Sequence, residues 1–166
     1  MTITRILAPT DFSADADAAL TYAQRLAQPF GASIHLLHVV EDPLAAGAWS
    51  SEVYTAEIAG LQINLVRDAE QRLQQYGAEQ GGPITTEVRT GPAARVILEF
   101  ATEKGMDLIV MGTHGRTGLA HIVMGSVAER VVRTAPCPVL TVRHPQHEFV
   151  TEGLLRPEPE TAAPIA

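Results

Sequence analysis

Short apolar runs alternate along this chain with longer stretches in which apolar residues recur every three or four positions. The strand-like segments fall at residues 3–9, 33–40, 84–90, 107–112 and 139–142, and a helical stretch lies between each pair of neighbours. Short apolar runs predict buried strands, and the three-to-four spacing predicts amphipathic helices. The alternation predicts an α/β fold with a single doubly wound, five-stranded parallel sheet and helices on both faces.

Residues at the ends of these segments support the same division. Ser13 is placed to cap the first helix and Gly31 to end it, while Pro92 suits the first position of the third helix. Ser126 and Glu129 fit a capping box at the start of the fourth helix. The segment 84–90 alternates apolar and polar residues, which favours an edge strand over a central one.

The stretch Met111–Val127 is the part of the chain with the clearest chemical content. An apolar run leads into Gly112 and Gly115, and after nine further residues Gly125 precedes a helical pattern. Glycines permit positive φ and close approach of backbone N–H groups, and a helix N-terminus favours an anion. The order strand, glycine-rich loop and helix therefore suits a phosphate chain, to which His114 and Arg116 could add charge. A connecting loop whose glycines only make turns is an equally good interpretation of the residues alone.

Two further residues have two interpretations each. Asp11 follows the strand at 3–9, at the end where open α/β sheets bind ligands. It either accepts hydrogen bonds from a ligand or bonds its own turn. Arg95, in the first turn of the third helix, either reaches a phosphate or is a surface arginine. His35 and His38 lie three apart in one strand, so they point to opposite faces and cannot share a metal ion.

Composition narrows the classes of function. With 166 residues, one domain is expected, and the net charge of −7 argues against nucleic acid and against anionic membrane surfaces as partners. The single cysteine allows no disulfide within the chain, and no apolar run approaches the ~18 residues of a membrane span. We see no signal peptide and expect a cytoplasmic protein.

Residues 144–166 hold four prolines and four glutamates, which predicts a disordered tail after a domain at 1–143.

Several of these segments together resemble the universal stress protein family, in its ATP-binding branch. The resemblance runs in one register over roughly residues 1–143 and rests on the glycine spacing of 112–126 and on residues 6–13, 36–39 and 136–140. It implies the strand order 3-2-1-4-5. The point at which this strand order reverses then lies between the first and fourth strands. It also implies the nucleotide contacts Pro9, Thr10, Asp11, Val39, Met111, Gly112, Gly115, Arg116, Gly125, Ser126 and Val127.

The expected function is therefore the binding of ATP, with Mg²⁺ held indirectly through the phosphates, in a stress response. We find no spacing typical of a nucleophile and its base, and no metal-ligand cluster, so we assign no catalytic and no metal-binding residue. Neither His114 nor His121 has an evident carboxylate beside it. The alternatives are a slow ATPase or phosphotransferase that uses one of these histidines, and an interaction module that binds no nucleotide. The resemblance also implies a homodimer that pairs strand Val139–Val142 with its copy; a protein partner beyond that is not identified.

Overall fold

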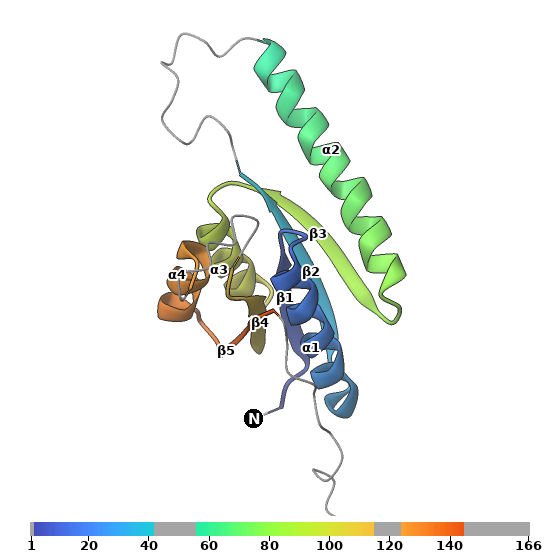
Figure 1. The fold of residues 1–166 in the computed structure, drawn as a ribbon, viewed down its shortest axis with the longest axis vertical. Helices are drawn as coiled ribbons and strands as arrows, with labels where there is room; N and C mark the ends of the chain where they lie inside the picture. The colour runs from blue at the N-terminus through green and yellow to red at the C-terminus, as the bar shows by residue number, and fades with distance from the viewer. Residues whose placement is uncertain (1, 42–55, 115–123, 145–166) are drawn as a thin grey trace, which may run out of the picture.

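The computed structural model describes residues 2–41, 56–114 and 124–144, and forms one five-stranded parallel sheet with helices on both faces (Figure 1). The strand order is β3-β2-β1-β4-β5, as predicted. The elements are β1 (Arg5–Thr10), α1 (Ala14–Phe30), β2 (Ser33–Val40), α2 (Ala56–Glu79), β3 (Ile84–Thr90), α3 (Ala93–Glu103), β4 (Leu108–Gly112), α4 (Ser126–Thr134) and β5 (Val139–Val142). The predicted fold class is confirmed.

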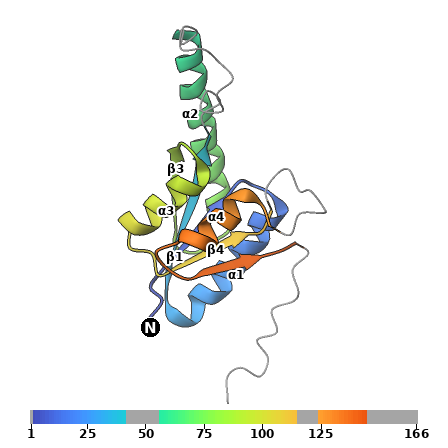
Figure 2. The same cartoon turned by 90° about the vertical axis from the view of Figure 1, so that its left-hand side faces the viewer.

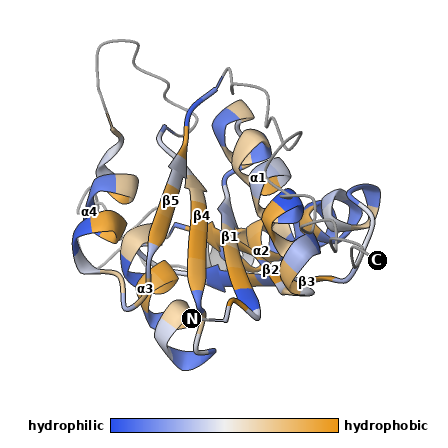
Figure 3. Ribbon diagram, turned by 90° about the horizontal axis from the view of Figure 1, so that it is seen from below, coloured by the Kyte–Doolittle hydropathy of each residue, from blue (hydrophilic) through white to orange (hydrophobic). Residues whose placement is uncertain are grey.

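Alternate residues of the central strands pack into two separate hydrophobic cores, one on each face of the sheet. Ile6 and Ala8 of β1 pack with α1 and α2 on one face, whereas Leu7 packs with α3 and α4 on the other. Figures 1 and 2 show these helix pairs on opposite sides of the sheet, and Figure 3 shows apolar residues along β1, β4 and β5. Burial on both faces explains why these strands read as continuous apolar runs.

The helix ends match the sequence signals in part. Ser13 caps α1, its hydroxyl accepting a hydrogen bond from the N–H of Ala16 at 3.3 Å, and Gly31 ends that helix at φ +61°. The predicted capping box is wrong, because Gly125 is the N-cap of α4 and Ser126 is already its first helical residue. Pro92 is likewise the N-cap of α3 rather than its first helical residue.

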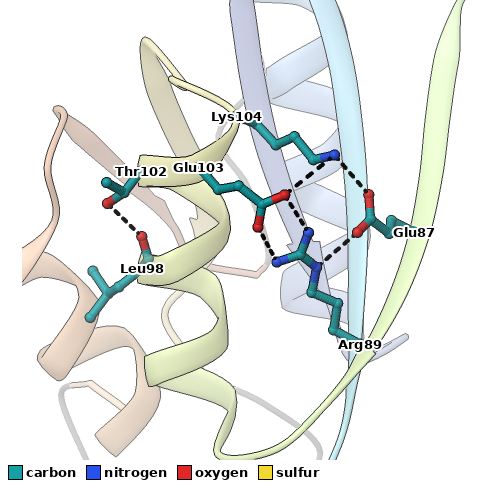
Figure 4. A network of polar contacts seen from close by, with 6 residues as sticks. All are labelled: Glu87, Arg89, Leu98, Thr102, Glu103 and Lys104. Atoms are coloured by element: carbon teal, nitrogen blue, oxygen red, sulfur yellow. Dashed lines mark hydrogen bonds and ion pairs between the residues drawn. The ribbon is translucent and has the colours of Figure 1, made fainter.

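The edge strand β3 is tied to α3 by a network of charged side chains (Figure 4). Arg89 of β3 binds both carboxylate oxygens of Glu103, at 2.7 and 3.1 Å, and binds Glu87 at 2.8 Å. The hydrogen bonds from Arg89 lower the pKa of the Glu103 carboxyl. Charged side chains along an edge discourage pairing with another chain, so this edge of the sheet is protected by its own residues.

Helix α2 packs on the sheet through its C-terminal half, while its N-terminal half projects beyond the sheet (Figures 1 and 2). The sequence offers Gly77 or Gly81-Gly82 as the end of this helix, and Gly77 lies inside it. A Cβ atom at Gly77 would lie 2.7 Å from Cγ2 of Thr86 on β3, so the absence of a side chain is what lets α2 approach the strand.

We expect Gly77→Ala to lower the free energy of unfolding by about 1–2 kcal/mol. Overpacking costs about 1–3 kcal/mol, and the better helix propensity of alanine returns up to about 1 kcal/mol. Gly60→Ala is the matched control, because it lies in the same helix with no described atom within 4 Å of its added Cβ. It should raise stability by up to about 1 kcal/mol. Urea unfolding curves that move in the same direction for both variants would contradict this account of the contact.

Candidate functional site

A cavity of about 380 Å³ lies at the carboxyl ends of β1, β2 and β4, beside the N-terminus of α4. The chain runs outward from β1 through β2 to β3, and then returns to the other side of β1 with β4 and β5. The strand order therefore reverses between β1 and β4. Open α/β sheets bind their ligands at such a point. The position of the cavity therefore agrees with the site expected from the strand order.

Nine of the eleven predicted nucleotide contacts line this one cavity. They are Pro9, Thr10, Asp11, Val39, Met111, Gly112, Gly125, Ser126 and Val127. The other two, Gly115 and Arg116, lie outside the described residues, as does His121. Residues from three distant parts of the chain thus meet around one space.

Asp11 bonds its own turn and also lines the cavity. Its Oδ1 accepts a hydrogen bond from the N–H of Ser13 at 3.1 Å, as a turn aspartate does, and the residue also lines the cavity. The next residue, Phe12, has φ +62° and is the only non-glycine residue with positive φ in the described part of the chain. Such strain is retained where the surroundings enforce it.

The surroundings of Phe12 are aromatic and cationic. Its ring centroid lies 4.6 Å from that of His38 and 4.0 Å from Cζ of Arg72 on α2. His38 is itself buried, with Nδ1 2.7 Å from the carbonyl oxygen of Thr10. These contacts hold the turn that carries Asp11. On the other face of β2, the ring of His35 is directed to Phe100 of α3, so the two histidines point apart as predicted.

The first turn of α4 also lines the cavity. The first helical bond runs from the N–H of Glu129 to the carbonyl of Gly125, at 2.9 Å. The N–H groups of Ser126, Val127 and Ala128 come before that bond, so they have no acceptor within the helix. All three residues line the cavity. These donors and the helix dipole favour an anion at this turn.

The glycines of the loop are needed for close packing rather than for positive φ. Gly125 has φ −68°, and Gly112 is not among the glycines with positive φ. A Cβ at Gly112 would lie 2.8 Å from Cβ of Asp15, and one at Gly125 would lie 3.3 Å from the carbonyl oxygen of Thr113. The expectation of positive φ is therefore wrong at these two positions.

Asp15 is the residue that the sequence analysis missed. Its Oδ2 accepts hydrogen bonds from the hydroxyl of Thr113 at 3.1 Å and from the N–H of His114 at 3.0 Å, and Oδ1 accepts from the N–H of His144 at 3.1 Å. Burial alone would raise the pKa of Asp15, but the hydrogen bonds from His114, His144 and Thr113 bring it below the ordinary value. Oδ2 also lies 3.3 Å from Nδ1 of His114, so the expectation that no carboxylate accompanies this histidine is wrong.

This group of side chains does not form a nucleophile activated by a histidine. The hydroxyl of Thr113 lies 3.0 Å from Nδ1 of His114, the same ring nitrogen that faces Asp15. A relay of that kind needs the hydroxyl and the carboxylate on different ring nitrogens. Among the described residues, no group of three or more His, Cys, Asp or Glu side chains could hold a metal ion.

Two other features lie apart from this cavity. Arg95 forms a surface ion pair with Glu99 at 3.2 Å, and its side chain is 67% exposed, which favours the surface interpretation. A hollow of about 480 Å³ lies at the amino ends of β2 and β3, between Gln24, Gly31 and Gly81. No charged residue lines it in the described structure, and no predicted site residue does so.

The chain matches the model of the universal stress protein family over residues 2–143, and it belongs to that family. It is similar to universal stress protein MJ0531 of Methanocaldococcus jannaschii, with 39% identity over 149 residues that cover 87% of this chain and 84% of that one. Its structure is similar to that of UspA from Lactobacillus plantarum, with a TM-score of 0.74, 28% identity, and coverage of 86% and 99% of the two chains.

A universal stress protein from Archaeoglobus fulgidus, solved in complex with dAMP, shares the fold. Its TM-score is 0.59 at 21% identity, over 86% of this chain and 99% of that one. Among the helices that the structure describes, none has the length and apolar composition of a membrane span.

Proposed function

We propose that this protein binds ATP, together with Mg²⁺, in the cavity at the carboxyl ends of β1, β2 and β4. It would act in a stress response, in the cytoplasm, through its conformation or through partner contacts rather than through catalysis. The observation that supports this most is that one cavity is lined both by Asp11, a carboxylate residue, and by the first turn of α4, whose N–H groups have no acceptor within the helix.

Different residues that line the cavity suit the phosphates, the ribose and the base of a nucleotide. The N–H groups of Ser126 and Val127 suit phosphate oxygens, which accept hydrogen bonds and carry charge. Asp11 suits the hydroxyls of a ribose or the amino group of a base, both of which donate. Val39 and Met111 also line the cavity and offer apolar contacts to a base. Gly115 and Arg116 would complete the phosphate cradle.

The described charges around the cavity favour a nucleotide whose own negative charge is offset by Mg²⁺. Neither Lys nor Arg is present among the described residues that line it, whereas Asp11 and Glu41 are. A triphosphate would therefore meet two carboxylates without a described basic side chain to offset its charge. Mg²⁺ usually binds through substrate phosphates with few protein ligands, so we expect ATP to bind as its magnesium complex.

Gly125→Val should reduce the affinity for Mg·ATP to below the range that calorimetric titration detects. A valine would push Thr113 away from α4 and displace the helix N–H groups. Micromolar binding corresponds to about −8 kcal/mol, and each lost hydrogen bond to a charged group costs about 1.5–3 kcal/mol. Gly60→Val, whose Cβ has open space on α2, is the control and should bind as the wild type does. A folded Gly125→Val protein with unchanged affinity would contradict the proposed cradle.

Slow hydrolysis is the second candidate, because Asp15 lies 3.3 Å from Nδ1 of His114, which lines the cavity. A carboxylate that orients one ring nitrogen can free the other to act as a general base. We nevertheless expect turnover far below the ~1–100 s⁻¹ of kinases and little change in His114→Ala. The reason is that backbone donors bind the ground state about as well as the transition state. Release of ADP within the kinase range, lost in His114→Ala, would favour an enzyme instead.

We further propose a homodimer formed through β5. This strand is the second edge of the sheet, and its residues Val139, Leu140, Thr141 and Val142 carry no charge, unlike those of β3. An uncharged open edge invites pairing, and antiparallel pairing with its copy would create a two-fold interface. Leu140→Lys should therefore shift the protein toward the monomer in light scattering while Mg·ATP titration remains unchanged. A wild-type protein that is monomeric at high micromolar concentration would refute this.

A further inference from the structure

Asp15 of α1 forms hydrogen bonds with the segments that follow β4 and β5. The residue lies in the first turn of α1 and is itself absent from the cavity lining, although its neighbour Ala16 is part of it. Its carboxylate accepts hydrogen bonds from Thr113 and His114, at the start of the loop that follows β4, and from the backbone of His144, just after β5. One side chain thus links α1 to the ends of two strands.

Thr113 is the point where the loop closes on itself. Its N–H donates to the carbonyl of Val142 on β5 at 2.9 Å, and its carbonyl accepts the N–H of Gly125 at 2.8 Å. Gly125 is the N-cap of α4, so the position of Thr113 determines where α4 begins. The backbone bonds of Thr113 are directed to β5 and to α4, and its side chain is directed to Asp15.

The packing around Gly112 fixes the end of β4 against the first turn of α1. A Cβ at Gly112 would lie 2.9 Å from the backbone carbon of Asp15, so the end of β4 is in direct contact with the first turn of α1. The side chain of Asp15 is only 14% exposed. Its bonds to Thr113 and His114 are partly buried, which limits the access of water to these donors, whereas the bond from His144 is exposed.

We propose that Asp15 is a positioning residue for the phosphate-binding loop: its carboxylate fixes Thr113, and through Thr113 it holds the N–H groups of α4 at the cavity. This inference rests on the proposed function for its consequence in ATP binding, but the hold on the loop can be measured without any ligand. If the loop loses this hold, the binding-competent arrangement is populated for a smaller fraction of the time. The apparent dissociation constant then rises by the inverse of that fraction.

The test compares Asp15→Ala with Asp17→Ala. Asp17 lies in the same first turn of α1 and carries the same charge, but its carboxylate accepts from the hydroxyl of Tyr76 rather than from the loop. Two quantities are measured on the full chain: the affinity for Mg·ATP by calorimetry, and the hydrogen exchange of the Gly125 amide without nucleotide. The Gly125 amide donates to Thr113 and makes no bond to Asp15, so a purely local effect of the substitution would not change its exchange.

We expect Asp15→Ala to weaken Mg·ATP binding by about tenfold or more, as a competent fraction of about one tenth would require, and to accelerate exchange of the Gly125 amide. Asp17→Ala should change neither. Asp15→Asn should be intermediate, because its one carbonyl oxygen can still accept from Thr113 and His114 but its amide group cannot accept from His144. This variant also serves if Asp15→Ala does not fold.

Unchanged Gly125 exchange in Asp15→Ala, or equal affinities in Asp15→Ala and Asp17→Ala, would overturn the inference. Tighter ATP binding in Asp15→Ala would overturn it as well, because the carboxylate would then act mainly by repelling phosphate. A wild-type protein that binds no nucleotide would instead overturn the proposed function, and the exchange of Gly125 would still decide whether Asp15 holds the loop.

Discussion

The hydrogen bond between the N–H of Gly125 and the carbonyl of Thr113, at 2.8 Å, is the contact on which the candidate site depends. It brings the two ends of the loop after β4 together, so that α4 begins beside the strand that leads into the loop. This contact fixes the first turn of α4 relative to the end of β4. A Cβ at Gly125 would lie 3.3 Å from the oxygen that accepts this bond, so a larger residue needs Thr113 to shift by a few tenths of an ångström.

Two of the segments beside the cavity are held by different means. Hydrogen bonds join Thr113, which follows β4, to Asp15, Gly125 and β5. In the turn after β1, Phe12 has φ +62°, and its ring contacts His38 and Arg72. Arg72 belongs to α2. Helix α2 is therefore in contact with the turn that follows β1, which connects the cavity physically to the helix that projects from the sheet.

Much of this architecture was predictable from local patterns. Strands buried on both faces read as apolar runs, and Ser13 and Gly31 mark the ends of α1. The resemblance to the universal stress protein family, rather than any local pattern, implied the nine residues that line one cavity. Asp15 was not predictable in this way, since its partner Thr113 lies 98 residues away and nothing in the local sequence distinguishes it from Asp17. The same holds for Gly77, whose need for glycine comes from Thr86 on another element. Ser126 and Glu129 have the spacing of a capping box, but closure of the loop makes Gly125 the cap instead.

We propose that a nucleotide occupies the cavity lined by Asp11 and α4 rather than the hollow at the amino ends of β2 and β3. Backbone amide chemical shifts, followed by nuclear magnetic resonance while Mg·ATP is added, test this most directly. The account predicts that the largest shifts occur at Asp11, Val39 and Ser126–Ala128, and that Gly31 and Gly81 in the other hollow do not respond. Shifts centred on Gly31 and Gly81, or no shifts at millimolar nucleotide, would contradict it.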